Sequence, residues 1–194
     1  MSEFEKTLNE VMLCRKCRLS ESRTNVVFGE GDLKAEVMLV GEAPGFNEDK
    51  EGKPFVGQAG KMLSETLLKA AGLKRSRIYI TNVVKCRPPG NREPTDEEVE
   101  ACLPYLEKQI QFIRPKLIVA LGNVAAGTLF RRFNIKTASM GSIHGKVFNV
   151  STLSCGNFKI IPSYHPATAL YKPNVSGVMM GDWVKIGEVL RSLK

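Results

Sequence analysis

Three short apolar stretches, separated by segments with helical patterns, constrain this chain more than any other feature. Residues 36–40, 77–84 and 117–121 have the composition of strands, and residues 117–121 are apolar throughout. A strand without a polar face is typical of a sheet that is buried on both sides. Apolar strands that alternate with helices favour a parallel sheet covered on both faces. We predict a three-layer α/β/α fold with a central, mainly parallel four-stranded sheet.

The segments between these strands carry helix signals. Thr95-Asp-Glu-Glu98 is a capping box, in which Thr and Glu side chains satisfy free amides at a helix start. Helices are expected over residues 3–13, 58–72, 96–113, 123–133 and 175–193, and further β-like stretches over 146–150 and 158–162. No repeat, low-complexity tract or linker divides the chain, so we expect residues 1–194 to form one domain.

The charge of the chain is biased towards the basic side. Lys and Arg number 28 against 20 acidic residues, a net charge of +8 among 194 residues. Such a balance favours a polyanionic partner, most often nucleic acid, although many basic proteins are simply solvated. No apolar run reaches membrane-spanning length and the N-terminus is charged, so we expect a cytoplasmic protein without a membrane partner.

Four of the five cysteines have the spacing of metal ligands. Cys14 and Cys17 form a Cys-x-x-Cys pair, and Cys86 and Cys102 follow at a distance. Two thiolates three positions apart converge from one turn, and two more would complete a shell for zinc or an iron–sulfur cluster. The alternative is a surface Cys-x-x-Cys with two buried structural cysteines. Cytoplasmic thiols stay reduced, which disfavours disulfides, and Cys155 is expected to be structural.

Polar residues follow several of the predicted strands. Gly41 and Glu42 end the first, Asn82 ends the second and His165 follows the last. In open parallel sheets the ligand crevice lies beyond these carboxyl ends. A carboxylate there can activate water or stabilise a cation, and a neutral imidazole can donate to developing negative charge. The plainer alternatives are a tight turn at residues 41–45 and a structural histidine.

The glycine-rich segment 52–61 invites a phosphate-loop interpretation, which fails. Counting back from Gly60-Lys61 puts Phe55 where the motif requires its first glycine, and Met62 follows the lysine. Phe55 is an unusual residue for such a loop. It is either a plug in the core or a stacking surface for a base, because every base offers a π-face.

Together these motifs resemble the family 4 uracil-DNA glycosylases, the iron–sulfur branch of the uracil-DNA glycosylase superfamily. The resemblance extends over nearly the whole chain, and the joint order and spacing of the motifs are far more specific than any one of them. The motifs that carry it are the four cysteines in order, Gly41–Gly45, Gly52–Gly57, Thr81–Pro89 and His165–Ala167.

This resemblance implies a 4Fe–4S cluster held by Cys14, Cys17, Cys86 and Cys102, a choice over zinc that spacing does not make. It also implies a monofunctional enzyme that flips uracil out of single- or double-stranded DNA and hydrolyses the N-glycosidic bond, which initiates base excision repair of deaminated cytosine. We further expect a monomer working at a prokaryotic nucleoid, and a contact with a sliding clamp is left open.

The resemblance implies roles for residues around the base. Phe55 stacks on the flipped uracil, Asn82 hydrogen-bonds its pyrimidine edge, and His165 faces O2, where negative charge gathers. The Asn82 amide has a donor and an acceptor, which match uracil O4 and N3–H, whereas cytosine presents the reverse pattern. Glu48 occupies the acidic position that would crowd the C5 methyl group of thymine.

The residue that activates water is the least defined of these roles. Family 1 enzymes place an aspartate after the strand, and here Ala43 stands at that position. The resemblance implies that Gly41 and Ala43 both bind the substrate. Glu42 and Asn91 are the candidates for positioning the attacking water. An asparagine cannot take a proton, so with Asn91 in that role catalysis would depend on stabilising the cation and the leaving uracil.

Two further predictions concern the DNA. Leu170 or Tyr171, after the histidine motif, is the candidate wedge that fills the gap left by the flipped base. Basic residues near the motifs are expected to meet phosphates: Arg15, Lys16, Arg18, Lys85, Arg87 and Arg92. The competing hypotheses are a non-catalytic nucleic-acid-binding module and a redox or zinc protein unrelated to DNA.

Overall fold

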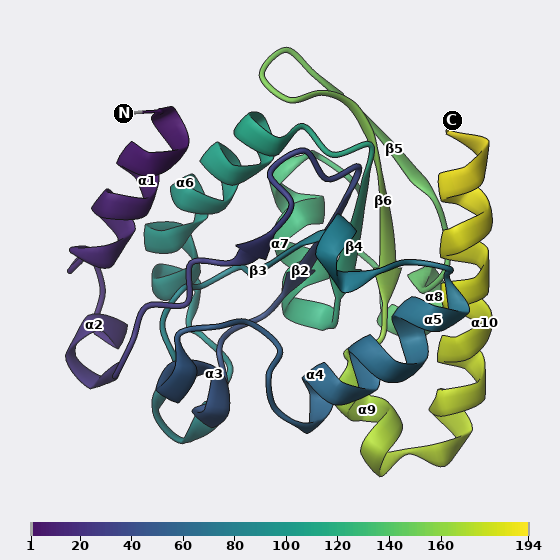
Figure 1. The fold of residues 1–194 in the computed structure, drawn as a ribbon, viewed down its shortest axis with the longest axis horizontal. Coiled ribbons are helices and arrows are strands. Elements are labelled where there is room, and N and C mark those ends of the chain that lie inside the picture. Colours follow the sequence, from purple (N-terminus) through teal and green to yellow (C-terminus); the bar gives the residue numbers. More distant parts are fainter. Residues whose placement is uncertain (1, 194) are drawn as a thin grey trace.

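A computed structural model describes residues 2–193, and Figure 1 shows its ribbon. Its six-stranded sheet has the order β1-β3-β2-β4-β6-β5, in which β3, β2, β4 and β6 are parallel. The strands are β1 Glu30–Gly31, β2 Val37–Gly41, β3 Tyr79–Asn82, β4 Leu117–Leu121, β5 Phe148–Thr152 and β6 Gly156–Ser163. The parallel four-stranded centre is as predicted, and β1 and β5 add antiparallel edges.

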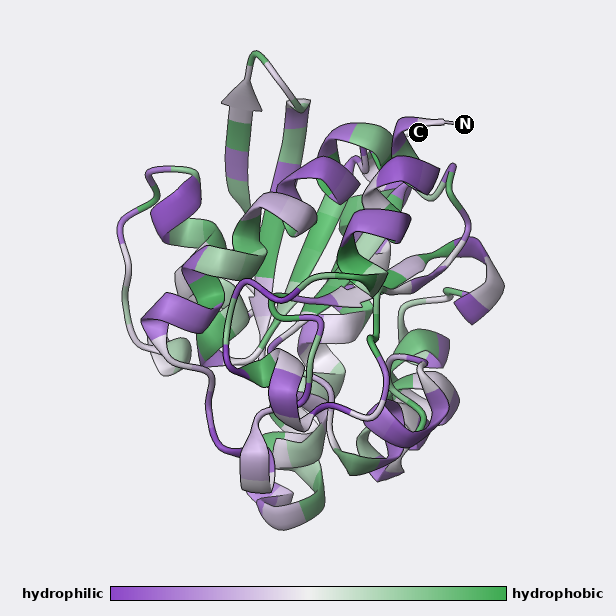
Figure 2. Ribbon diagram, turned by 90° about the vertical axis from the view of Figure 1, so that its left-hand side faces the viewer, coloured by the Kyte–Doolittle hydropathy of each residue, from purple (hydrophilic) through white to green (hydrophobic). Residues whose placement is uncertain are grey.

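Successive side chains of the central strands enter two separate cores, one on each face of the sheet. In β2, Met38 and Val40 pack with α6 (Asp96–Ile113) and α7 (Asn123–Arg132). Val37 and Leu39 pack on the other face with α5 (Leu68–Ala70) and α10 (Pro173–Ser192). Figure 2 shows apolar strands in the middle of the molecule, with helices around them that carry both polar and apolar residues. This is the predicted three-layer arrangement.

The remaining helical elements have three to ten residues each. They are α1 Glu3–Met12, α2 Leu19–Ser22, α3 Phe46–Glu51, α4 Gln58–Met62, η1 Leu63–Leu67, η2 Arg75–Arg77, η3 Pro89–Asn91, α8 Met140–Ile143 and α9 Pro166–Tyr171. The helix expected over 58–72 is interrupted by η1, a π-helical turn. The predicted capping box is present, since the Thr95 hydroxyl accepts from Glu98 N and the Glu98 carboxylate accepts from Thr95 N.

The carboxyl ends of the parallel strands lie at one end of the molecule. Helices α3 and α4, which follow β2, and α9, which follows β6, gather there, at the bottom of Figure 1. Helix α1 packs on α6 and brings the N-terminal arm to the same side of the sheet as α6. Among residues 2–193, no helix combines the length and the apolar character needed to span a membrane.

Candidate functional site

The ends of β2 and β3 lie side by side, with Gly41 paired in register with Asn82. A Cβ on Gly41 would collide with Asn82 Oδ1 and approach the Phe55 ring to 2.9 Å. Glycine is therefore required here because the backbone must pass directly beneath two side chains. His165 joins them, with its ring stacked on that of Phe55 at a centroid distance of 5.6 Å. We call Gly41, Phe55, Asn82 and His165 the strand-end site.

The Asn82 amide is buried without a full set of partners. The residue is 2% exposed, and among residues 2–193 its Nδ2 has no hydrogen-bond partner. Leaving a buried donor unpaired costs about 1–3 kcal/mol. Such a group is typical of a binding site, where a ligand acceptor supplies the missing hydrogen bond.

The backbone of Phe55 has an unusual conformation. Its φ is +51°, in the left-handed region that L-residues other than Asn and Asp seldom occupy, and its ring is 6% exposed. The ring belongs to the core on the α5–α10 face and also meets His165. Strained residues of this kind persist only where the surroundings hold them, and they cluster at functional sites.

His165 is held in one tautomer by the start of α9. Its Nδ1 accepts a hydrogen bond of 3.2 Å from Ala167 N, which leaves the proton on Nε2. Burial lowers the pKa of the imidazole, and the nearby Glu48 carboxylate opposes that shift. The neutral ring with a free Nε2–H is therefore favoured, as a donor to an oxygen with growing negative charge requires.

Glu48 connects the two glycine-rich loops. Its Oε1 accepts from Val56 N and Gly57 N, each at 3.0 Å, and its Oε2 accepts from Gly45 N at 3.1 Å. These hydrogen bonds were not predicted from the sequence, although a Gly45 N-cap followed three residues later by Glu48 has the spacing of a helix start. A carboxylate that accepts hydrogen bonds from three amides is held in one position.

The two candidates for positioning water differ in their surroundings. Glu42 is half-buried directly after Gly41, and burial raises its carboxyl pKa, with the Glu93 carboxylate adding to the effect. Asn91 lies on the exposed turn η3, where its Oδ1 accepts from Arg87 Nε at 2.7 Å. No hydrogen bond between described residues joins Asn91 to the strand-end site. Ala43 is half-buried and packs against the core on the α6–α7 face.

Four cysteines line one pocket between the N-terminal arm and the loop after β3. The four are Cys14, Cys17, Cys86 and Cys102. Arg23, Lys85 and Tyr105 also line this pocket. None of the four cysteines is in a disulfide. Cys155 lies in the β5–β6 turn and is buried, as expected of a structural residue. We call the four-cysteine site the cysteine pocket.

The donor set of the cysteine pocket fits a thiolate-bound metal centre. Burial raises the pKa of the Cys17 and Cys86 thiols and that of Cys102 to about 11. Thiolates would therefore need positive charge beside them, and Arg23 Nη1 lies 3.2 Å from Cys86 Sγ. Among residues 2–193, no three His, Cys, Asp or Glu side chains are arranged to hold a single metal ion.

Lys85 corrects one prediction. It was expected to face DNA, but it is 1% exposed and its Nζ donates to Thr81 Oγ1, the Asn82 carbonyl and Gln109 Oε1 at 2.6–2.7 Å. Burial lowers the pKa of this ammonium to about 7. Its backbone N also donates to Cys102 Sγ at 3.3 Å. Lys85 thus links the cysteine pocket to the strand that carries Asn82.

The other residues expected near DNA remain at the surface. Arg15, Lys16, Arg18 and Arg92 are exposed and Arg87 is half-buried. Arg92 pairs with Glu98 at 2.7 Å, and the Arg87 guanidinium lies over the exposed ring of Phe46 at 5.1 Å. The two wedge candidates, Leu170 and Tyr171, end α9 and are 42% and 79% exposed.

Comparisons with known proteins agree on one family. The sequence profile of the Uracil DNA glycosylase superfamily matches residues 28–185. The type-4 uracil-DNA glycosylase of Sulfurisphaera tokodaii is 48% identical over 189 residues, 97% of this chain and 86% of the relative. Those of Saccharolobus solfataricus and Archaeoglobus fulgidus are each 47% identical, over 99% and 97% of this chain and 88% and 94% of their own lengths.

Proposed function

The chain belongs to the type-4 uracil-DNA glycosylases, a branch of the uracil-DNA glycosylase superfamily, and on that premise we propose how its residues remove uracil from DNA. The reaction hydrolyses the N-glycosidic bond of a flipped deoxyuridine and leaves an abasic site for repair. The observation that carries the proposal is the buried, unpartnered Nδ2 of Asn82 between Gly41 and Phe55.

Asn82 reads the pyrimidine edge in this mechanism. Its unpartnered Nδ2 donates to uracil O4 and its Oδ1 accepts from N3–H. Cytosine carries a donor at position 4 and an acceptor at N3. The same amide would then place its donor against a donor and its acceptor against an acceptor. A site built to pair with specific polar groups rejects a ligand that leaves its buried groups unpaired.

Phe55 and His165 act on the base as it leaves. Phe55 offers a face for stacking, and Nε2–H of neutral His165 donates to O2 as negative charge develops there. The glycosidic electron pair stays with uracil N1 when the bond to C1′ breaks, and the sugar gains oxocarbenium character. Uracil later takes a proton from solvent, so His165 does not need to give one up.

Glu42 acts on the sugar and the attacking water rather than on the base. Its ionised carboxylate stabilises the cationic sugar and orients water toward C1′, where the new C–O bond forms. The proton released by that water passes to Glu42 or to solvent. We assign this role to Glu42 rather than Asn91, because Glu42 adjoins Gly41, whereas the side-chain oxygen Oδ1 of Asn91 already accepts a hydrogen bond from Arg87 Nε.

Glu48 and the basic surface complete the substrate site. We assign to Glu48 the exclusion of a C5 methyl group. Three hydrogen bonds from backbone amides hold its carboxylate in position. Arg87 and the arginines and lysine beside the cysteine pocket are assigned to phosphates, and Leu170 or Tyr171 to the gap in the duplex. The enzyme is proposed to act as a monomer in the cytoplasm, and a sliding-clamp contact stays untested.

The cysteine pocket is assigned a structural 4Fe–4S cluster. Cys14, Cys17, Cys86 and Cys102 would hold it, and four cysteine ligands leave no coordination position for substrate. Such a centre would tie the N-terminal arm to the loop after Asn82.

The proposal is tested with a labelled oligonucleotide that contains one uracil. After incubation with the protein, hot alkali should cleave the strand at uracil, and matched oligonucleotides with cytosine or thymine at that position should stay intact. Release of uracil, measured chromatographically, should match the number of abasic sites. A protein that binds this DNA but leaves uracil in place over a range of salt and temperature would contradict the enzymatic assignment.

A further inference from the structure

Arg75, twenty residues further along the chain, binds the loop that carries Phe55. We call residues 54–57 the stacking loop. Arg75 Nη2 donates to the Pro54 carbonyl at 2.6 Å, and Arg75 Nη1 donates to the Phe55 carbonyl at 3.0 Å. We propose that Arg75 is a positioning residue, which holds the Phe55 ring where it can stack on uracil. This proposal rests on the proposed function.

The grip on the stacking loop comes from two opposite sides. Arg75 binds the carbonyls of its first two residues, while Glu48 binds the amides of Val56 and Gly57 at 3.0 Å. Below the loop, Gly60 approaches so closely that a Cβ there would collide with the Phe55 carbonyl. A residue with φ of +51° costs about 1–2 kcal/mol relative to ordinary conformations, so the loop needs such restraint.

Arg75 is itself anchored to the sheet. Its Nη2 is 2.7 Å from Glu30 Oε1, and Nη1 also donates to Ser64 Oγ at 3.1 Å. Glu30 lies in β1 and pairs in register with Ile80, two residues before Asn82 in β3. The guanidinium therefore connects the backbone of Phe55 to β1, which pairs with β3, the strand that carries Asn82. The guanidinium has five N–H donors, enough for these four acceptors, whereas a lysine ammonium has three.

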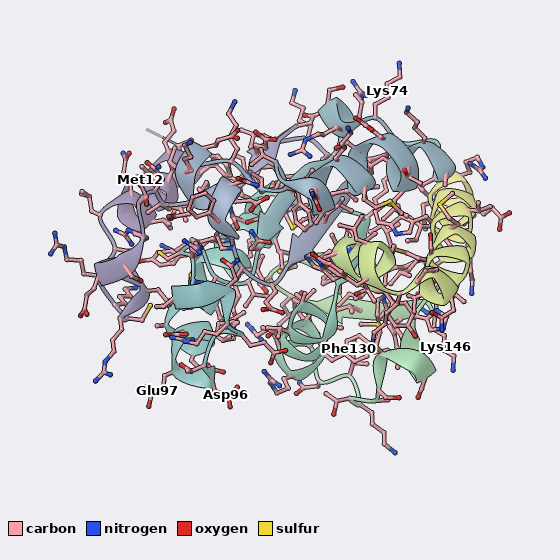
Figure 3. The ribbon with its side chains drawn as sticks, turned by 90° about the horizontal axis from the view of Figure 1, so that it is seen from below. Met12, Lys74, Asp96, Glu97, Phe130 and Lys146 are labelled. Carbon is pink, nitrogen blue, oxygen red and sulfur yellow. The ribbon has the colours of Figure 1, made fainter. Side chains whose placement is uncertain are left out.

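The contacts that Arg75 makes with the stacking loop are to backbone carbonyls, not to the Phe55 ring. Arg75 belongs to the turn η2 after α5, and its neighbour Lys74 lies at the rim of the molecule when it is viewed from the strand ends (Figure 3). Arg75 reaches the base only through Phe55, so its loss should misplace the ring rather than remove a contact with DNA. Misplacement by about 1 Å far from the chemistry can cost about 100-fold in rate.

The test compares Arg75→Met with Arg77→Met, because Arg77 lies in the same turn but is exposed and, among residues 2–193, has no hydrogen bond or ion pair with the stacking loop. We expect kcat/KM for uracil excision to fall about 10- to 100-fold in Arg75→Met, mostly through KM, and to stay within about threefold in Arg77→Met. Both variants should be compared as folded protein, below the midpoint of thermal unfolding.

A double-mutant cycle separates positioning from general stability. In a Phe55→Ala background the ring is absent, so Arg75→Met should cost less than about threefold there. Equal costs in the two backgrounds, or an Arg75→Met enzyme as active as wild type, would overturn the proposal. If Arg75→Met does not fold, Arg75→Lys replaces it and should show the same dependence on Phe55 with a smaller effect.

Amide hydrogen exchange tests the grip without any catalysis. Val56 and Gly57 should exchange at least about tenfold faster in Arg75→Met than in Arg77→Met, while amides in α6 stay unchanged. Unchanged exchange in the stacking loop would refute the positioning role even in an active enzyme. An inactive wild-type protein would instead count against the proposed function, and exchange would still decide whether Arg75 holds the loop.

Discussion

Residues 82–86 connect the strand-end site, which contains Asn82, to the cysteine pocket, which contains Cys86, yet the polar groups of the two sites are satisfied in opposite ways. Around the cysteine pocket, Arg23 and the backbone of Lys85 donate to two of the sulfurs. In the strand-end site, Asn82 keeps a buried donor without a partner. A structural site satisfies its groups from within the protein, whereas a recognition site leaves them for the ligand.

Lys85 joins the two regions. One end of the residue donates from its backbone to Cys102, and the other end donates from its side chain to the Asn82 carbonyl. The cysteine pocket can thus affect the strand-end site through contacts that involve no substrate. We therefore expect substitution of a cysteine in the pocket to lower both stability and activity. Substitution of Asn82 in the strand-end site should lower activity alone.

The largest effect on activity is expected from Asn82→Ala. Removing the amide takes away recognition of the pyrimidine edge, and kcat/KM for uracil should fall about 1,000-fold. Because the variant also removes an unsatisfied buried group, its unfolding free energy should not decrease by more than about 1 kcal/mol. Steady-state excision and urea unfolding measure the two. Normal uracil excision by Asn82→Ala would disprove the role of this residue.

Cys17→Ala should affect the two properties together. Loss of a ligand to a structural centre should lower the unfolding free energy by about 4 kcal/mol or more and lower activity through the folded fraction. Iron content, absorbance near 400 nm and thermal unfolding should change in parallel. Cys155→Ala is the matched control, since that cysteine does not line the pocket. A Cys17→Ala protein without iron but with full stability and activity would show that the pocket is dispensable.

Lys85→Met tests the link between the regions. The methionine keeps most of the buried volume but leaves Thr81, the Asn82 carbonyl and Gln109 without their shared donor. We expect a loss of about 2–4 kcal/mol in stability and a further loss of activity in the fraction that remains folded. Urea unfolding and single-turnover excision measure these. Unaltered activity per folded molecule would mean that the two regions are independent.

The smallest effect is a pH dependence that comes from Glu42, the residue directly after Gly41 of the strand-end site. Burial raises the Glu42 pKa above its ordinary value, so kcat/KM should fall as the pH decreases through that raised pKa, by about tenfold per unit once Glu42 is protonated. Glu42→Gln should be slow at every pH and lack this acid limb. A carboxyl with a raised pKa destabilises the fold when ionised, so Glu42→Gln should be slightly more stable at neutral pH. The difference should vanish below the unfolded-state pKa, about 4.

Several features were predictable because the physics behind them is local. The apolar run of β4 indicated burial on both faces, and the Thr95–Glu98 spacing indicated the start of α6. The carboxyl ends of parallel strands meet at one edge, which placed Gly41, Asn82 and His165 together. The short helices α2, α3, α8 and α9 escaped prediction because they span too few residues for a periodic pattern to emerge.

By itself, the sequence determined the layered sheet, the set of four cysteines and the strand ends that carry the polar residues. Only the tertiary structure decided that Lys85 is buried, and that Glu48 and Arg75 hold the stacking loop. The reason is the distance along the chain between partners. Lys85 is satisfied by Gln109, which is 24 residues away, and Arg75 reaches Glu30 across 45. Periodicity reports which face of an element is buried, but a polar side chain is placed by partners that only folding brings near.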